Sequence, residues 1–277
     1  MFAYYIHDLS PFLIHFSGNF GIRYYGLAYI LGFFALYYGL RYQIQKGWLR
    51  LNLQQVDDFT FMACLIGVVV GGRLGYCLFY SRELFFQNPL LLFKVWEGGM
   101  ASHGGILGVI VAMLWFSKKV QIPFYQLADA AALCTPIGLG LGRIANFING
   151  EIWGRPSELP WAVIFPHAPR VMGEMVPRHP SQLYEAFLEG FLLFVILWII
   201  RHRTKKTGVV ALSFMALYAL LRIFGEQYRE PDIEIGYLWQ GLTQGQALSI
   251  AMLLMTVILI LFQSKEWRKI KKRKTIE

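Results

Sequence analysis

The chain has 277 residues, of which 56% are hydrophobic and 16% charged, and its mean hydropathy is +0.45. A water-soluble domain of this length could not bury so much apolar surface. The composition therefore excludes that class and is typical of a protein with several membrane-spanning helices. Cys64, Cys77 and Cys134 fall inside apolar stretches without metal-ligand spacing, so we expect neither a disulfide framework nor a metal site.

Apolar stretches of spanning length follow one another along the chain. A span needs roughly 20 mainly apolar residues to cross about 30 Å of hydrocarbon. The sequence predicts seven spans, at about 22–41, 57–80, 103–117, 125–147, 181–200, 208–228 and 243–263. The third is short and is expected to extend into its flanks. The opening MFAYYIHDLS lacks a basic region, so we do not expect a cleaved signal peptide. We predict an all-α, polytopic membrane fold with about seven helices.

Basic residues gather in alternate loops. They follow the first, third and fifth spans and fill the tail: Arg41, Lys46, Arg50, Lys118, Lys119, Arg201, Arg203, Lys205, Lys206, Lys265, Arg268, Lys269, Lys271, Lys272, Arg273 and Lys274. This is the positive-inside pattern for an amino terminus outside and a carboxyl terminus in the cytoplasm. The formal net charge of +9 and the KKRK run at 271–274 could also indicate nucleic-acid binding. The loop pattern favours attraction to anionic lipid, so we expect no nucleic-acid partner.

Four arginines lie within or at the edge of the predicted spans: Arg23, Arg73, Arg143 and Arg222. A charge at such depth costs roughly 2.5–3.5 kcal/mol on insertion scales, and persists mainly where it is paired or functional. In the predicted orientation all four lie toward the outer leaflet. The same layer holds His103 and the polar residues that open the fifth span, His179, Gln182 and Glu185.

The spacing within this layer predicts local pairs. Arg143 and Asn146 share a helical face, and Tyr218, Arg222 and Glu226 recur every four residues. Glu226 can therefore pair with Arg222. An interhelical polar clamp would explain any single pair, but it gives no reason for the whole layer to share one leaflet.

Arginines at this depth suit a phosphate ligand, because the guanidinium keeps its charge and presents a planar fork of donors. Phospholipid headgroups supply phosphate there. The glycine-rich stretches 67–75 and 102–108 could bring backbone close to a ligand, although helix packing is the favoured interpretation. His103 precedes two glycines at a helix mouth, where a neutral imidazole could accept a proton. A lone histidine can equally be structural.

At this point the motifs resemble those of a known family, the bacterial phosphatidylglycerol–prolipoprotein diacylglyceryl transferases. The likeness runs in order along nearly the whole chain. It rests on RYYGLAYILGF (23–33), GGRLGY (71–76), HGG (103–105), GRIANFINGEIWGR (142–155), RHPSQLYEAFLEG (178–190), the Tyr218/Arg222/Glu226 stripe and REPD (229–232).

The resemblance implies an inner-membrane enzyme that moves the diacylglyceryl group of phosphatidylglycerol to the thiol of a preprolipoprotein's lipobox cysteine. The products would be a thioether and glycerol phosphate. We accordingly expect one transmembrane catalytic domain over 1–277, with an outer loop at 155–178 and a basic cytoplasmic tail at 264–277. The outer loop looks shorter than in some relatives. The nucleophile comes with the protein substrate, so we expect no cofactor. The expected partners are phosphatidylglycerol, the preprolipoprotein lipobox region and membrane lipids.

The resemblance also assigns the site. Catalytic roles fall on His103, Arg143, Arg222 and Glu226, and substrate-binding roles on Tyr25, Arg143, Asn146, Glu151, Gly154, Tyr218 and Arg222. We expect His103 to take the thiol proton. Arg143 and Arg222 would stabilise the departing phosphate, as donors of this kind commonly do by about 3–4 kcal/mol each.

Two other classes remain open. A lipid transporter or flippase predicts polar groups at the midplane and often an internal repeat, whereas this layer is one-sided and we see no repeat. A non-catalytic lipid-binding scaffold predicts that the arginines suffice and that His103 is dispensable.

Overall fold

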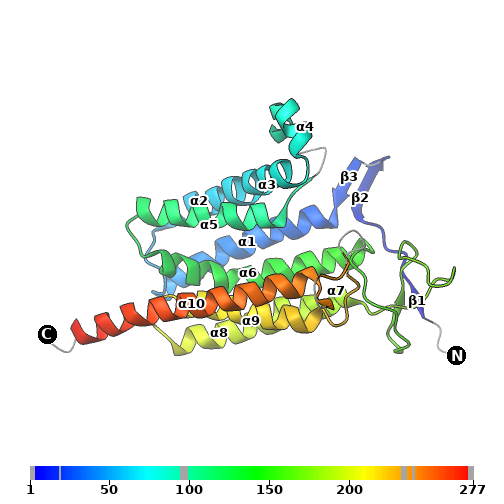
Figure 1. Cartoon of the computed structure of the whole chain (residues 1–277). Helices are drawn as coiled ribbons and strands as arrows, with labels where there is room; N and C mark the ends of the chain where they lie inside the picture. The colour runs from blue at the N-terminus through cyan, green and yellow to red at the C-terminus, as the bar shows by residue number, and fades with distance from the viewer. Residues whose placement is uncertain (1–3, 19, 94–98, 232–235, 239–240, 274–277) are drawn as a thin grey trace. The chain divides into compact units, whose positions relative to one another are not determined.

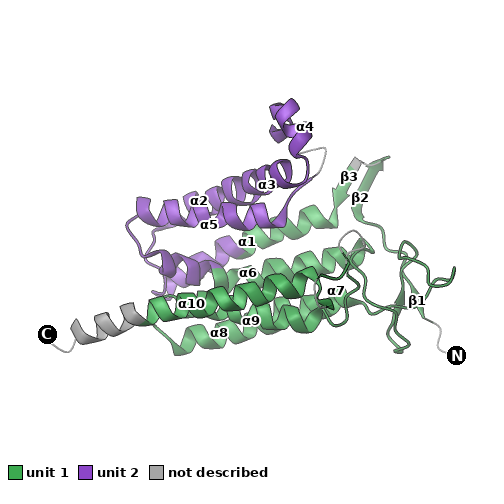
Figure 2. Cartoon of the chain, viewed as in Figure 1, with its two compact units in different colours: residues 1–35, 132–277 green, residues 36–131 purple. Residues whose placement is uncertain are grey.

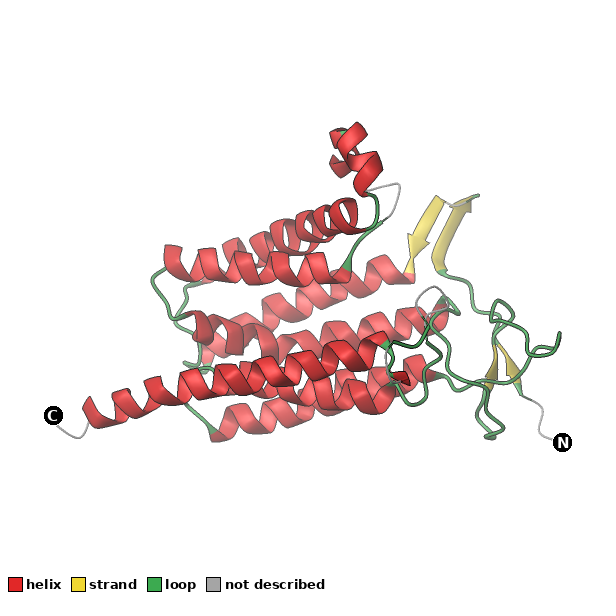
Figure 3. Cartoon of the chain, viewed as in Figure 1, coloured by secondary structure: helices red, strands yellow, loops and turns green. Residues whose placement is uncertain are grey.

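The computed structural model describes residues 4–18, 20–93, 99–231, 236–238 and 241–273, with side chains described as far as Ser264 except that of Phe20 (Figure 1). The last residues of the predicted basic tail, 274–277, and Asp232 of the REPD motif lie outside this part. Most described residues are helical (Figure 3). The chain forms two compact units, 1–35 with 132–277 and 36–131, drawn in separate colours in Figure 2. The divisions fall inside helices α1 (Tyr24–Gln45) and α6 (Phe124–Ile148).

The unit of residues 36–131 contains one long helical stretch and a helix packed on it. The stretch consists of α2 (Leu53–Met62), the π-helical η1 (Ala63–Val70) and α3 (Gly71–Phe79). It begins with a capping box between Asn52 and Gln55. Helix α5 (Ser102–Lys119) packs against η1 and α3, and two short helices, α4 (Arg82–Gln87) and η2 (Pro89–Phe93), follow α3.

Glycines bring α5 and the long helical stretch into backbone contact. A Cβ atom added at Gly71 would lie 2.7 Å from the carbonyl oxygen of Gly104 and 2.9 Å from Cα of Gly108. One added at Gly104 would lie 2.8 Å from Cα of Gly75. Only hydrogen fits at these positions, so these glycines of the stretches 67–75 and 102–108 serve helix packing, the interpretation that the sequence favoured.

The other unit is built on α6 and the three helical segments that follow it. These are α7 (Ser181–Glu185), π-helical η4 (Ala186–Leu192) and α8 (Leu193–Arg203) in one run, then α9 (Val209–Gly225) and α10 (Gln244–Arg273). Helix α9 packs against both α8 and α10. Gly140 of α6 meets Gly190 of η4 so closely that a Cβ atom at Gly190 would lie 2.7 Å from Cα of Gly140.

Short strands and loops complete this unit at the end of α6. The strands are β1 (Tyr5–Ile6), β2 (Phe12–Ser17), β3 (Phe20–Arg23) and β4 (Val163–Ile164). β2 and β3 form an antiparallel hairpin that leads into α1, and β1 pairs in parallel with β4 of the loop at 155–178. His7 donates a 2.7 Å hydrogen bond from Nε2 to the Phe147 carbonyl oxygen and packs near Phe165. The amino-terminal segment is thereby fixed to the end of α6.

Every predicted span coincides with a helical segment, and the all-α membrane fold is confirmed. Four helices in the described part are long and apolar enough to cross a bilayer: 53–79, 124–148, 181–203 and 244–264. Val209–Gly225 is apolar but shorter. Helices α1 and α5 are not among these four. Helix α1 is rich in tyrosine, and α5 has Ser102 and His103 at one end and two lysines at the other, which lowers the hydropathy of both helices. The count of seven crossings and the orientation stay predictions.

Candidate functional site

Two arginines and two glutamates from three helical segments form a closed ring of charges. Arg143 of α6 donates from Nε and Nη2 to Oε2 of Glu189, both at 3.1 Å. Arg222 of α9 donates from Nη1 to Oε1 of Glu185 at 2.6 Å and to Oε1 of Glu189 at 3.2 Å. Nη1 of Arg143 lies 3.0 Å from Oε2 of Glu185 without hydrogen-bond geometry. Each carboxylate therefore bridges both guanidinium groups.

The ring extends through Glu226 to the start of α10. Arg222 forms an ion pair with Glu226, as the four-residue spacing predicted. The other oxygen of that carboxylate accepts a 2.7 Å hydrogen bond from the Thr243 hydroxyl. A Cβ atom at Gly245 would lie 2.6 Å from the Glu226 carboxyl carbon. Arg229 completes the cluster, with Nη1 at 3.7 Å from Glu226 and 4.0 Å from Glu185.

The cluster is nearly buried and balanced in charge. It contains three arginines and three glutamates, and the glutamate side chains are 1–4% exposed while the arginine side chains are 10–16% exposed. Burying a single charge is costly unless a partner and hydrogen bonds compensate it. The mutual pairing explains how so many charges persist in an apolar bundle.

Asn146 and Glu151 lie at the turn that ends α6. The Asn146 amide donates to Oε1 of Glu151 at 2.8 Å, and that oxygen also accepts from Asn149 at 3.3 Å. Gly150 has φ +64°, a left-handed conformation that favours glycine. The Asn149–Gly150 pair thus turns the chain back so that Glu151 faces Asn146. The Glu151 backbone oxygen accepts a 2.6 Å bond from Gln182, which connects this turn to α7.

Gly154 lies where three chain segments meet. A Cβ atom there would lie 2.5 Å from the His179 carbonyl oxygen and 2.6 Å from that of Tyr228. Its own carbonyl oxygen accepts a 3.1 Å bond from Arg178. The substrate-binding role that the resemblance assigned to Gly154 stays a prediction; its observed contacts join the loop after α6 to His179 and Tyr228.

The two predicted tyrosines differ in their surroundings. Tyr218, one turn before Arg222, lies within electrostatic range of both ring arginines and stacks on Phe214 with ring centroids 5.8 Å apart. Tyr25 lies in the first turn of α1, half-buried, with its ring 5.6 Å from that of Tyr29. Among the described contacts none joins Tyr25 to the ring.

His103 and Arg73 belong to the unit of residues 36–131. His103 is exposed in the first turn of α5, and its approach to the ring stays a prediction. Arg73 is 2% exposed and donates to backbone oxygens, from Nη2 to Leu91 at 2.7 Å and from Nη1 to Gly99 at 3.1 Å. These bonds fix the backbone at Leu91 and at Gly99, which favours a structural role for Arg73. Arg23 instead stacks its guanidinium on Phe12 at 4.8 Å.

Sequence reasoning missed Glu189 and Arg229 as members of the charge cluster. Glu189 follows Glu185 by four residues within the quoted motif RHPSQLYEAFLEG, so the same helical spacing that linked Arg222 to Glu226 could have identified it. The sequence points to Arg229 only through the REPD motif at 229–232.

His179 lies in the loop just before α7. Its Nδ1 is 3.3 Å from the Tyr184 hydroxyl, and its ring makes edge contacts with Tyr184 and Tyr228. Burial lowers the pKa of His179 from its ordinary value. The arrangement favours a neutral imidazole in this loop.

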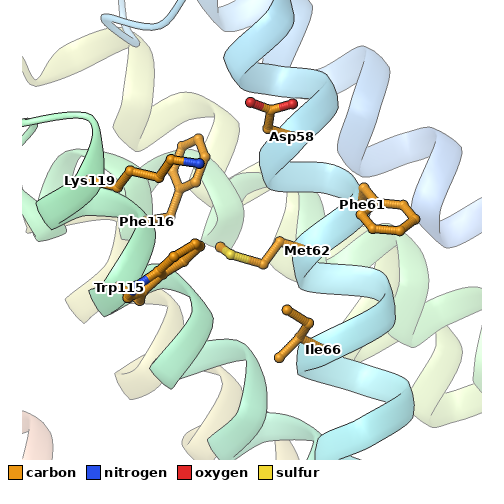
Figure 4. A pocket seen from close by; sticks show the side chains of 7 residues that line it. All are labelled: Asp58, Phe61, Met62, Ile66, Trp115, Phe116 and Lys119. Carbon is orange, nitrogen blue, oxygen red and sulfur yellow. The ribbon is translucent and has the colours of Figure 1, made fainter.

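A cavity of about 280 Å³ lies elsewhere, in the unit of residues 36–131 (Figure 4). Its lining residues are Asp58, Phe61, Met62, Ile66, Trp115, Phe116 and Lys119. None of the residues assigned to the site lines it. Lys119 lies over the Trp115 ring at 5.3 Å and Asp58 accepts from Gln54, so its two charged groups already have local partners.

Comparison with known proteins gives consistent matches. Residues 11–262 match the family model described as prolipoprotein diacylglyceryl transferase. The chain is 48% identical over 252 residues to the phosphatidylglycerol–prolipoprotein diacylglyceryl transferase of Bradyrhizobium diazoefficiens, with 88% of each chain covered. It is 48% identical over 255 residues to that of Methylococcus capsulatus, covering 91% of this chain and 94% of the relative. For that of Geobacter sulfurreducens the identity is 47% over 248 residues, with 90% and 93% covered.

Proposed function

The chain belongs to the prolipoprotein diacylglyceryl transferase family, and from that premise we propose that it transfers the diacylglyceryl group of phosphatidylglycerol to the lipobox cysteine of preprolipoproteins. The charge ring of Arg143, Arg222 and their carboxylates is the observation that carries the proposal. It concentrates guanidinium donors, the groups that best bind phosphate, in a buried site of a bacterial membrane protein.

We place the enzyme in the cytoplasmic membrane, with the site toward the outer leaflet. The alternation of basic loops supports this orientation. Lipobox cysteines would then meet the site on the side where phosphatidylglycerol headgroups of the outer leaflet lie.

The reaction forms one bond and breaks one. The cysteine sulfur attacks the carbon of the diacylglyceryl group that carries the phosphate. The C–S bond forms, and the C–O bond to phosphate breaks, with its electron pair remaining on the phosphate oxygen. Glycerol phosphate leaves. The thiol, with an ordinary pKa near 8.5, must lose its proton to become the nucleophile. We assign that proton to His103, which would release it to the leaving phosphate or to solvent.

The balanced charge of the whole cluster suits this reaction. The phosphodiester of the substrate carries one negative charge, and a second develops as the C–O bond breaks. The three arginines of the site are already neutralised by three glutamates. We therefore expect only weak attraction of the singly charged phosphodiester in the ground state. Donors of Arg143 and Arg222 that remain available would interact most strongly with the developing charge, and only such differential binding accelerates the chemical step.

Purified protein, phosphatidylglycerol and a lipobox peptide would test the activity by mass spectrometry. We expect the peptide to gain one diacylglyceryl unit. Arg143→Ala should lower kcat/KM by at least about 100-fold, because removing one preorganised donor commonly costs that much. Arg170→Ala, which removes an exposed outer-loop arginine, is the control and should be unaffected. Wild-type turnover by Arg143→Ala would refute the phosphate-holding role.

The role of His103 has its own measurement, the pH–rate profile of His103→Gln. Loss of the rate together with a changed pH dependence would support proton transfer. An unchanged rate and profile would remove His103 from the proton-transfer step, whereas binding of phosphatidylglycerol without any modification of the peptide would favour the scaffold alternative. Movement of intact phosphatidylglycerol across a vesicle membrane, without modified peptide, would favour a transporter.

A further inference from the structure

Glu189 has the most contacts to the two site arginines, yet it has no assigned role in the reaction. It lies in π-helical η4 and is fully buried. Single π-helical turns occur frequently at functional sites, where they rotate side chains relative to the rest of a helix. Here Glu185, the last residue of α7, and Glu189, the fourth residue of η4, both face the same pair of guanidinium groups.

A backbone contact sets the distance between Glu189 and Arg143. Gly190 follows Glu189 directly, and its Cα approaches Gly140 of α6 closely enough to leave no space for a Cβ atom. Arg143 lies three residues after Gly140, about one helical turn further along α6. The close helix approach therefore places the Arg143 guanidinium directly beside the Glu189 carboxylate.

Glu189 and Glu185 bind mainly different arginines. Both described hydrogen bonds of Arg143 go to Oε2 of Glu189, whereas its contact with Glu185 is an ion pair only. The shorter hydrogen bond from Nη1 of Arg222 goes to Glu185. Glu189 thus determines the plane of the Arg143 guanidinium, and its second oxygen, 3.2 Å from Arg222, fixes the spacing of the two cations.

From this geometry we propose that Glu189 is a positioning residue, which orients Arg143 toward the lipid phosphate and holds it at a fixed distance from Arg222. The inference rests on the proposed function. Two of the five N–H donors of the guanidinium bind Glu189 and lock its orientation, so that others are directed at the ligand. Glu189 does not touch the substrate itself.

The two acceptor oxygens give this proposal a distinctive test. In Glu189→Gln the shape is kept, but the amide has one acceptor and one donor group. It can bind one arginine and must present N–H groups to the other. Glu189→Asp keeps both acceptors and the charge but is one methylene shorter. A positioning role therefore predicts that Asp retains more activity than Gln, whereas a packing role predicts that Gln, the closer match in shape, retains more.

The measurement is steady-state kinetics of the full-length protein with phosphatidylglycerol and a lipobox peptide. We expect Glu189→Gln to lower kcat/KM for the lipid by about 10-fold to 100-fold, the range for losing a hydrogen bond to a charged group. Glu189→Asp should lower it less, by about 3-fold to 10-fold, and KM for the peptide should stay within 2-fold in both. Glu158→Gln, which changes an exposed glutamate of the outer loop, is the matched control and should match wild type.

The outcomes separate this inference from the proposed function. If Arg143→Ala loses turnover while Glu189→Gln retains the wild-type rate, only the role of Glu189 is overturned. A Gln variant more active than the Asp variant would also overturn it. If Glu189→Gln cannot be recovered folded, Glu189→Asp decides alone, since a wild-type kcat/KM for that variant contradicts the proposal.

Discussion

Replacing Gly104 with alanine tests the backbone contact between α5 and α3. The added Cβ atom would lie 2.8 Å from Cα of Gly75 and would also meet the carbonyl oxygen of Gly71. Both neighbours are backbone atoms of a packed helix, so they cannot rotate away as a side chain could. Gly105, the next residue, has nothing nearer to its would-be Cβ atom than 3.8 Å. Gly105→Ala is therefore the matched control.

Two opposing effects determine how much each substitution changes the free energy of unfolding. Alanine in place of glycine inside a helix stabilises by about 1 kcal/mol, and this gain applies to both variants. Overpacking costs typically about 1–3 kcal/mol, and it applies only to Gly104→Ala. The difference between the two variants isolates the packing cost, and we expect about 2–3 kcal/mol because backbone atoms are involved.

Thermal unfolding and SDS titration of the purified protein in one detergent would measure this difference. Gly71→Ala should behave like Gly104→Ala, because its Cβ atom would lie 2.7 Å from the Gly104 carbonyl oxygen. Equal stability of Gly104→Ala and Gly105→Ala would refute the reasoning, since it would mean that the helices do not approach at this glycine.

Three further outcomes are expected. Arg73→Met should lower the unfolding temperature in detergent and expose the segment after α4 to proteolysis, because the backbone oxygens of Leu91 and Gly99 lose their donors; unchanged proteolysis would contradict the structural role. Thr243→Val removes the donor to Glu226 and should lower turnover about 5-fold to 20-fold, with Thr243→Ser close to wild type; equal rates for both variants would argue against that hydrogen bond. Burial lowers the pKa of His179 from 6.5, so the unfolded chain binds this proton at higher pH than the folded chain. The neutral His179 contributes fully to the free energy of unfolding above about pH 6.5, and this contribution is lost as the pH falls. The fall in unfolding temperature between pH 7 and 5.5 should therefore be smaller in His179→Phe.

The helices were predictable because each is a long apolar run between polar loops, and their observed bounds differ from the predicted ones by a few residues. The predicted span 125–147 is α6 at Phe124–Ile148. The last helix is the exception, since α10 continues to Arg273 although its apolar part ends near Ser264. Hydropathy reports where lipid can cover a helix and not where its backbone hydrogen bonds stop.

Contacts between distant segments were not predictable in the same way. The pairing of β1 with β4 joins the amino-terminal segment to the loop at 155–178, and both strands have only two residues, too few for a periodic pattern. Spacing within one helix correctly predicted the Arg222–Glu226 pair. It could not show that Arg143 would meet Glu189, 46 residues away, because that contact depends on the close approach of Gly140 and Gly190.

The charge ring also constrains how the protein is made. Its members enter the bilayer on separate helices and in chain order, first Arg143, then the carboxylates of the next helical run, then Arg222 with Glu226. Until α7 and η4 arrive, Arg143 lacks its carboxylate partners, and until α9 arrives Glu185 and Glu189 share a single arginine. An unmatched charge in hydrocarbon is costly. We therefore expect newly synthesised chains that stop before α9 to be held less stably in the membrane than the full-length chain.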